Sequence, residues 1–175
     1  MPLLDVQNLR VDLRTHRGST AAVRSVSFAL EHGDTLGLVG ESGCGKSLTA
    51  LALMGLLPEA AQVSGSIRLQ GQELIGLDEP ALCRLRGNRI AMVFQEPMTA
   101  LNPLHRIGQQ VAEPLRRHQG LGAAAARTEA LALLQRVGIP QAAQRLDQYP
   151  HQFSGGQRQR ITIAMALACK PALLL

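Results

Sequence analysis

A glycine-rich octapeptide near the start of the chain constrains its fold more than any other stretch. The octapeptide fits the pattern G-x-x-x-x-G-K-[ST]. Its residues are Gly40, Glu41, Ser42, Gly43, Cys44, Gly45, Lys46 and Ser47. The short apolar run 35–39 before it predicts a buried strand, and residues 46–57 after it carry apolar side chains at helical spacing until Pro58. A strand, a glycine-rich loop and a helix in this order indicate a phosphate-binding P-loop.

The residue types in the octapeptide match the chemistry of phosphate binding. Glycines let the backbone curl so that successive N–H groups point at one phosphate, and the helix N-terminus adds partial positive charge. In such a loop, Lys46 bridges the β- and γ-phosphates and the Ser47 hydroxyl ligates Mg²⁺. The alternative is a strand-to-helix turn that binds nothing, and the flanking pattern disfavours it.

Composition places the chain among folded globular proteins. With 175 residues, 46% of them hydrophobic, it has the size of one domain with a real core. The net charge of +5, carried by 16 Arg and 2 Lys, is compatible with nucleic acid or a membrane surface as partner. One Tyr, three Phe and no Trp leave few stacking platforms for single strands, so a solvated arginine-rich surface is favoured.

Cysteine usage and hydropathy indicate the cellular setting. Cys44, Cys83 and Cys169 are odd in number and far apart, which favours a reducing cytoplasm over a disulfide framework or a zinc site. Residues 1–10 carry no apolar signal core, and the longest apolar stretch, 161–169, is about half as long as a membrane span. We therefore expect a soluble chain, whose partner can still be a membrane protein.

The first part of the chain alternates in the manner of a small antiparallel β region. Residues 3–13 and 21–30 predict two strands, and residues 66–70 begin a further hairpin that turns at 71–72. A second buried strand is predicted over 90–94.

Gln95 lies at the carboxyl end of that second buried strand. Because ligands of open α/β sheets lie beyond the carboxyl ends of strands, Gln95 is placed to reach a nucleotide. Spacing alone still favours an ordinary polar residue that closes a strand. A short helix over 78–86, with Asp78 as its N-cap, precedes the strand.

Helical periodicity dominates the rest of the chain. It runs through residues 104–148, with Pro114 as a potential kink and 123–137 as the clearest helix, and it resumes after residue 154. An apolar strand is predicted at 172–175.

The second helical pattern begins with a distinctive turn. Ser154 and Gln157 form the capping box S-x-x-Q. A plain helix start explains Gly155 and Gly156 poorly, because glycine costs about 1 kcal/mol in a helix. Their bare N–H groups at a helix N-terminus predict a second anion site.

These motifs, in this order, resemble the ATP-binding subunit of ABC transporters over essentially all 175 residues. Residues 40–47 match the Walker A motif of that family, and Gln95 matches its Q-loop glutamine. The run Phe153-Ser154-Gly155-Gly156-Gln157 matches its signature, with Phe153 where Leu is usual. The individual residues within and around these motifs are similar to those of the dipeptide and oligopeptide import branch of the family. The similarity lies at residues 40–47, 94–98, 101–103 and 149–152, and the branch also contains nickel importers.

The resemblance implies an α/β fold, a P-loop NTPase core of ABC type with an N-terminal antiparallel β region and a helical subdomain. It implies one nucleotide-binding domain over residues 1–175. The β region and P-loop core would cover about 1–98, the helical subdomain about 99–153 and the signature helix 154–169.

The resemblance also implies an activity, ATP hydrolysis that powers transmembrane transport of peptides, with ATP and Mg²⁺ as cofactors. Two such domains sandwich two ATP molecules head to tail. Residues 40–47 of one subunit hold the phosphates, and the signature residues of the other close on the γ-phosphate; these are Ser154, Gly155, Gly156 and Gln157. Lys46 and Gln95 take the catalytic roles, while Ser47 and Gln95 contact Mg²⁺, or the attacking water in the case of Gln95.

The implied partners are a second ABC domain, transmembrane permease subunits and, indirectly, a substrate-binding protein; nucleic acid is not expected. Residues 94–103 and the helices to residue 148 would contact the permease, and Thr99 and Leu101 are natural crosslinking positions. The implied location is peripheral, at the cytoplasmic face of the inner membrane.

The chain departs from the family pattern in two places. Leu13, with His16 nearby, occupies the position where the family stacks adenine on an aromatic side chain. Leu175 falls where the Walker B strand runs into its Asp and catalytic Glu, and a switch His follows further on in the family. We therefore expect an N-terminal fragment of a longer chain with one or two ABC domains, and no useful hydrolysis by residues 1–175 alone.

Two other classes of function remain to be weighed. Soluble ABC-type ATPases act on nucleic acid or ribosomes, but those with long coiled coils are disfavoured because 58 residues without sustained heptads separate Gln95 from Ser154. A nucleotide-binding sensor without hydrolysis is the third class. The resemblance favours the transporter subunit over both.

Overall fold

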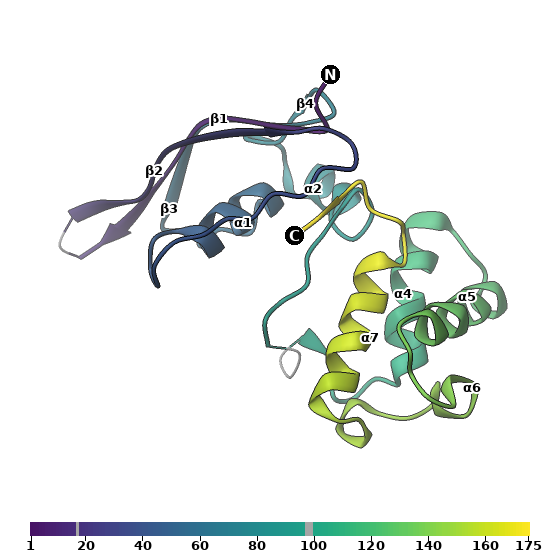
Figure 1. Ribbon diagram of the computed structural model, residues 1–175. Coiled ribbons are helices and arrows are strands. Elements are labelled where there is room, and N and C mark those ends of the chain that lie inside the picture. Colours follow the sequence, from purple (N-terminus) through teal and green to yellow (C-terminus); the bar gives the residue numbers. More distant parts are fainter. Residues whose placement is uncertain (17, 97–99) are drawn as a thin grey trace. The chain divides into compact units, whose positions relative to one another are not determined.

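The computed structural model describes residues 1–16, 18–96 and 100–175 (Figure 1). The chain divides into two compact units, residues 1–83 and 84–175, and each is described by itself. Pro97 and Met98, which contribute to the resemblance, and Thr99, a proposed crosslinking position, lie outside the described residues.

The first unit, residues 1–83, is built on an antiparallel sheet with strand order β2-β1-β3-β4. Its elements are β1 (Leu4–Thr15), β2 (Gly18–Leu30), α1 (Lys46–Met54), β3 (Ala61–Leu69) and β4 (Gln72–Glu73). Side chains of β1 are buried at positions 4, 6, 9 and 11, with the alternation shifted by the irregularity at Asn8. Ile67 and Leu69 of β3 join them in the core. The predicted antiparallel β region is confirmed. The hairpin turn falls at Gln70 and Gly71, both with positive φ, which is the backbone of a two-residue turn.

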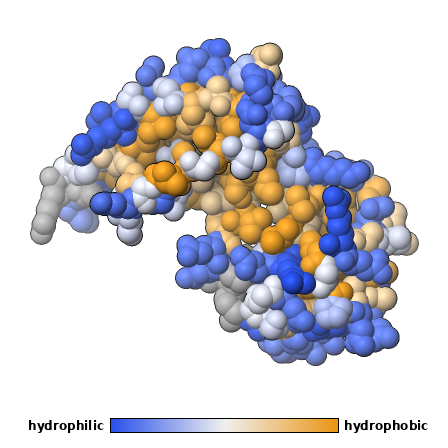
Figure 2. All heavy atoms as spheres, viewed as in Figure 1, coloured by the Kyte–Doolittle hydropathy of each residue, from blue (hydrophilic) through white to orange (hydrophobic). Residues whose placement is uncertain are grey.

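Two predictions around the P-loop are wrong. Residues 35–39 form no strand, and Val39 is 92% exposed, because within the described residues of this unit no strand hydrogen-bonds to this segment. Helix α1 ends at Met54 rather than near Pro58. Gly55 adopts the left-handed conformation with φ 61, and its N–H donates to the Ala52 carbonyl, which closes the helix. In the face drawn in Figure 2, this unit presents apolar surface.

Short helix α2 (Glu79–Leu85) leads from the first unit into the second. The Asp78 Oδ1 accepts a hydrogen bond from the Ala81 N–H at 2.9 Å, so the predicted N-cap is confirmed.

The second unit, residues 84–175, consists mainly of helices around one apolar core (Figure 1). Its helices are α4 (Ile107–Gln119), α5 (Ala123–Arg136), α6 (Ala142–Arg145), the 3₁₀ turn η1 (Pro150–Gln152) and α7 (Gly155–Leu167). Helices α4, α5 and α7 pack on one another, and their shared core includes Ile107, Leu134 and Ile161. Helix α4 continues through Pro114.

A parallel pair of short strands completes the second unit. Strand β5 (Ile90–Ala91) pairs with β6 (Leu173–Leu174), and the Val93 N–H extends the pairing by donating to the Leu175 carbonyl at 2.9 Å. Both strands lie where the sequence predicts them and are shorter than predicted. The observed combination of antiparallel sheet, parallel pair and helices agrees with the predicted α/β class.

No helix in the described ranges combines the length and apolar character needed to cross a bilayer.

Candidate functional site

The P-loop wraps around the side chain of its own lysine. The Lys46 Nζ donates to the carbonyl oxygens of Gly40 and Glu41 at 2.7 Å each and lies 3.5 Å from the Cys44 Sγ. The ammonium group is therefore held at the centre of the loop by backbone oxygens. This places its positive charge where the loop closes on itself, and a phosphate entering the loop would meet it there.

Gly45 is the one residue of the P-loop that the rest of the first unit holds in place. It is buried, its φ is 94°, and a Cβ added there would lie 2.6 Å from the Ala22 carbonyl oxygen of β2. A side chain would collide with backbone, so only glycine fits. Gly45 is also the N-cap of α1, and no side chain of the described residues caps that helix end. The first-turn N–H groups are thus open to an anion.

Ser47 lies exposed in the first turn of α1. A lone hydroxyl at a phosphate-binding loop suits Mg²⁺, which takes one or two protein oxygens and completes its shell with phosphate and water. Within the described ranges, no three His, Cys, Asp or Glu side chains gather as a metal cluster. The donor set therefore fits a metal ion that arrives with a nucleotide, and does not fit a resident metal site.

Gln95 is exposed and follows the last backbone hydrogen bond of the β5–β6 pair, which Val93 makes. It thus stands at the carboxyl end of a strand, as predicted. Phe94 beside it is 45% exposed, so the predicted strand does not remain buried to its end.

The turn that opens α7 has the predicted capping box. The Ser154 Oγ accepts from the Gln157 N–H at 3.3 Å, and the Gln157 Oε1 accepts from the Ser154 N–H at 3.2 Å. Gly155 and Gly156 are exposed, and a Cβ added at either would meet nothing within 4 Å in the described chain. The packing of the described chain therefore does not require glycine at either position.

Two arginines that the sequence analysis did not single out, Arg145 and Arg158, contact the residues of this turn. The Arg158 Nε donates to the carbonyl oxygens of Pro150 and Phe153 at 2.8 and 2.9 Å. The Arg145 guanidinium lies over the Phe153 ring, 4.1 Å from its centroid. Arg145 comes from α6, so no local sequence pattern marks its contact with the turn, whereas Arg158 directly follows the signature motif and contacts the two residues Pro150 and Phe153 just before it.

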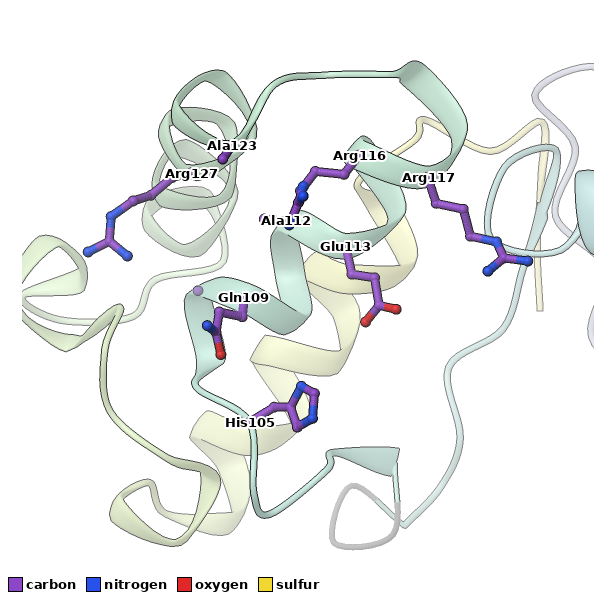
Figure 3. A pocket seen from close by; sticks show the side chains of 9 residues that line it. His105, Gln109, Ala112, Glu113, Arg116, Arg117, Ala123 and Arg127 are labelled. Carbon is purple, nitrogen blue, oxygen red and sulfur yellow. The ribbon is translucent and has the colours of Figure 1, made fainter.

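A hollow of about 670 Å³ lies between α4 and the start of α5 (Figure 3). Its lining combines apolar surface with three arginines and one carboxylate. The residues are His105, Gly108, Gln109, Ala112, Glu113, Arg116, Arg117, Ala123 and Arg127. We call it the α4–α5 hollow.

Charges at the α4–α5 hollow are only partly balanced. Arg127 points away from it (Figure 3) and forms a two-pronged ion pair with Asp147 at 2.8 and 3.0 Å, and its hydrogen bonds hold the pKa of Asp147 below its ordinary value. Arg116 and Arg117 have no ion pair among the described residues. Glu113 is the single carboxylate of the lining. Excess positive charge thus faces solvent at this site.

Comparison with known proteins decides the family. The family model described as "ABC transporter" matches residues 23–175. The chain belongs to the ABC transporter family. This agrees with the resemblance predicted from the sequence, including the ABC type of its P-loop core.

The relatives of this ABC chain include peptide transport proteins. It is 49% identical over 174 residues to the oligopeptide transport ATP-binding protein OppD of Haemophilus influenzae, covering 99% of this chain and 54% of that protein. It is 51% identical over 175 residues to the dipeptide transport ATP-binding protein DppD of Bacillus subtilis, covering 99% of this chain and 52% of that protein. The chain thus spans about half the length of these curated relatives.

Solved ABC cassettes share the fold. The ATP-binding cassette MJ0796, in a dimeric post-hydrolysis state with ADP and Pi, superposes with a TM-score of 0.84 at 26% identity, over 98% of this chain and 72% of that one. The protein cbiO1 from Clostridium perfringens, part of the ABC transporter complex cbiONQ, gives a TM-score of 0.74 at 25% identity, over 99% of this chain and 64% of that one.

Proposed function

We propose that this chain belongs to an ATP-hydrolysing subunit that powers the import of peptides across a membrane. The observation that carries the proposal is the P-loop geometry, in which Lys46 is centred in the loop and the N-terminus of α1 is uncapped. The peptide transport relatives, matched over nearly the whole chain, support peptides as the cargo.

The P-loop binds ATP through a small set of groups. Backbone N–H groups of residues 40–45 and of the first turn of α1 surround the phosphates, and Lys46 exchanges its carbonyl partners for the β- and γ-phosphate oxygens. Ser47 would hold the Mg²⁺ that accompanies the nucleotide, and the ion would supply positive charge for the transferred phosphoryl group. The family resemblance also assigns Gln95 a contact to this ion. Gln95 orients the attacking water. A neutral amide accepts a proton poorly, so Gln95 is a positioning group rather than a general base.

The turn formed by Ser154, Gly155, Gly156 and Gln157 acts on nucleotide held by a second ABC domain. Gly155 and Gly156 are exposed, and the packing of the described chain does not require glycine at either position. Their N–H groups lie in the first turn of α7. The dimeric state of the solved cassette with ADP and Pi supports a pair of domains. In the same proposal, residues 1–175 form one nucleotide-binding domain, divided at about 98 and 153 into P-loop core, helical subdomain and signature helix.

The helical segment 104–148 contacts the transmembrane permease, which places the subunit peripherally at the cytoplasmic face of the membrane. The α4–α5 hollow supports this surface and indicates its chemistry. Arg116 and Arg117 lack ion pairs in the described chain, so a cytoplasmic permease segment with acidic side chains would complete them. Leu104, which directly precedes His105 of the hollow lining in the sequence, is 81% exposed and offers an apolar anchor.

The function is tested by reconstituting the complete importer in vesicles and measuring ATP-driven uptake of labelled dipeptides and longer peptides, with Ni²⁺ as the competing cargo. We expect peptide to stimulate ATP turnover and to accumulate inside. If the rate of ATP hydrolysis does not change with permease or peptide but rises with DNA or ribosomes, the soluble ABC-type ATPase is established instead. ATP binding without any turnover would establish the sensor.

The permease surface is tested by crosslinking and charge reversal. Leu101 is 3% exposed and is therefore a poor crosslinking position, whereas a cysteine at Leu104 is accessible. We expect Leu104→Cys to crosslink to the permease and His16→Cys, on the first-unit hairpin, not to do so. Arg116→Glu should weaken assembly with the permease, while Arg136→Glu, at an exposed position of α5 outside the hollow, should not. If Arg116→Glu instead abolishes binding to permease-free anionic vesicles only, the hollow contacts lipid.

A further inference from the structure

Arg145, the last residue of α6, contacts the signature turn through the Nη2 and the face of its guanidinium group. Its Nη2 donates to the Gln152 carbonyl at 3.1 Å and to the Gln157 Oε1 at 3.5 Å. Its plane covers the buried Phe153 ring at 4.1 Å. These contacts fall on the residues immediately before and after residues 154–156, and they require a planar, branched cation.

The signature turn needs such support because glycine has no side chain whose packing could fix the position of its backbone. Gly155 and Gly156 have no side chain to pack, and nothing in the described chain lies within 4 Å of a Cβ added there. A donor aimed at a phosphate acts only if it is held in position beforehand. The neighbours of the two glycines must therefore fix where their N–H groups point.

The same arginine also joins the turn to the wall of the α4–α5 hollow. Its Nε donates to the Gln148 Oε1 at 2.8 Å, and the Gln148 carbonyl accepts from the Ile107 N–H at 2.9 Å at the start of α4. One residue earlier, Asp147 holds Arg127 of the hollow lining. A short hydrogen-bonded path thus runs from the hollow to the signature.

We propose that Arg145 is a positioning residue for the signature turn. Its contacts with Gln152, Phe153 and Gln157 fix the orientation of the turn. The N–H groups of Gly155 and Gly156 thereby point toward the nucleotide of the second domain. The proposal rests on the proposed function of that turn. Arg145 lies outside the P-loop, so its loss acts on turnover and on ATP-driven pairing of domains and leaves ATP binding by this chain intact.

Steady-state ATPase measurements on the assembled importer, together with nucleotide binding to the P-loop, test this role. We expect Arg145→Ala to lower kcat about tenfold or more, while KM and the Kd for Mg-ATP stay within about twofold. Arg145→Lys keeps the charge and loses the fork and the stacked plane, so it should restore little. Arg136→Ala removes an exposed arginine that makes none of these contacts and should leave kcat unchanged.

The ring contact is tested separately with Phe153→Leu. We expect Phe153→Leu to lower kcat less than Arg145→Ala does. In the double variant, Phe153→Leu should add little to the effect of Arg145→Ala, because each substitution removes the same contact between guanidinium and ring. Full activity of Arg145→Ala, or full rescue by Arg145→Lys, would overturn the proposal, as would equal losses of kcat and of ATP affinity.

The outcomes separate this inference from the proposed function. A wild-type importer without ATP turnover would contradict the function itself. A wild-type importer that turns over normally beside an unaffected Arg145→Ala importer would contradict only the role of Arg145. If Arg145→Ala does not fold, Arg145→Lys and Phe153→Leu, which retain bulk at both positions, decide the matter by the same kcat measurement.

Discussion

The P-loop and the signature turn each place glycine at the start of a helix, and the chain holds the two in different ways. In the P-loop, Gly45 is buried against the Ala22 carbonyl, and the polar contacts come from within the loop through Lys46. In the signature turn, a Cβ added at Gly155 or Gly156 would meet nothing within 4 Å of the described chain. Besides the capping box of the turn itself, the contacts come from Arg145 of α6 and Arg158 of α7. Glycine is thus a requirement of the fold in the first turn, whereas in the second the packing of the described chain does not require it.

Their flanking segments differ in the same sense. Residues 35–39 before the P-loop are exposed and unpaired within the described part of the first unit. Phe153 before the signature turn is 3% exposed and lies under Arg145. The signature turn is therefore shaped within the second unit, whereas the P-loop relies mainly on its own backbone and on the start of α1.

The largest expected effect comes from removing the internal contact of the P-loop. Lys46→Ala should lower the affinity for Mg-ATP about a hundredfold, because the variant loses the charge-assisted contacts that we propose its ammonium group makes to phosphate. The fold should persist, since the hydrogen bonds of the lysine side chain to Gly40, Glu41 and Cys44 all stay within its own exposed loop. Calorimetric titration of the variant, with Lys170→Ala as the control at the other lysine, measures it. Equal affinity in wild type and Lys46→Ala would show that this loop is not the nucleotide site.

The same substitution should have opposite effects on stability in the two turns. Gly45→Ala places a methyl group against the Ala22 carbonyl at a φ of 94°, and we expect it to lower the free energy of unfolding by about 1–3 kcal/mol. Gly155→Ala meets nothing and removes helix-disfavouring glycine, so it should raise the free energy of unfolding by up to about 1 kcal/mol.

Denaturant unfolding of Gly45→Ala and Gly155→Ala measures the change in the free energy of unfolding for each variant. The rate of ATP hydrolysis by the assembled importer then measures the effect on function. Gly155→Ala should combine greater stability with slower ATP turnover. Destabilisation by Gly155→Ala would mean that the signature glycine, too, is required by the chain's own packing, and the contrast between the turns would fail.

Alkylation of Cys44 examines access to the P-loop. Cys44 is exposed, with its Sγ 3.5 Å from the Lys46 Nζ, so a maleimide there should block nucleotide binding. Mg-ATP at about ten times its Kd should slow the labelling about tenfold. Mass spectrometry follows each cysteine, and Cys83, which is half-buried outside the loop, serves as the internal control. An unchanged labelling rate at Cys44 would place the nucleotide elsewhere.

The smallest effect concerns acid stability of the segment behind the signature. Hydrogen bonds from Arg127 hold the pKa of Asp147 below its ordinary value of 3.8, so the pair contributes stability that is fully present above about pH 4 and is lost as the pH falls through the lowered pKa. Asp147→Asn should therefore remove a small part of the acid-dependent loss seen in thermal unfolding between about pH 5 and 2. An identical pH profile in wild type and Asp147→Asn would show that the pair adds nothing.

Features that depend on a few neighbouring residues could be predicted from the sequence. The Asp78 N-cap and the capping box of Ser154 and Gln157 each close a hydrogen bond within three residues, so their spacing suffices to identify them. The antiparallel region followed from alternation, and the helices from their apolar period. Gly55 was a local signal of the same kind that the prediction of a longer α1 overlooked.

Other features were decided only by partners distant in the sequence. An apolar run such as 35–39 becomes a strand only where another strand supplies a ladder, and the run itself does not specify that neighbour. The α4–α5 hollow exists because two helices with a given crossing leave space between polar faces. Arg145 reaches Phe153 because the backbone turns back between them, and a guanidinium recognises a ring or a carbonyl by position in space, which no sequence period records. The sequence by itself thus determined the local shape and chemistry of both glycine turns, while the tertiary structure decided what supports each of them.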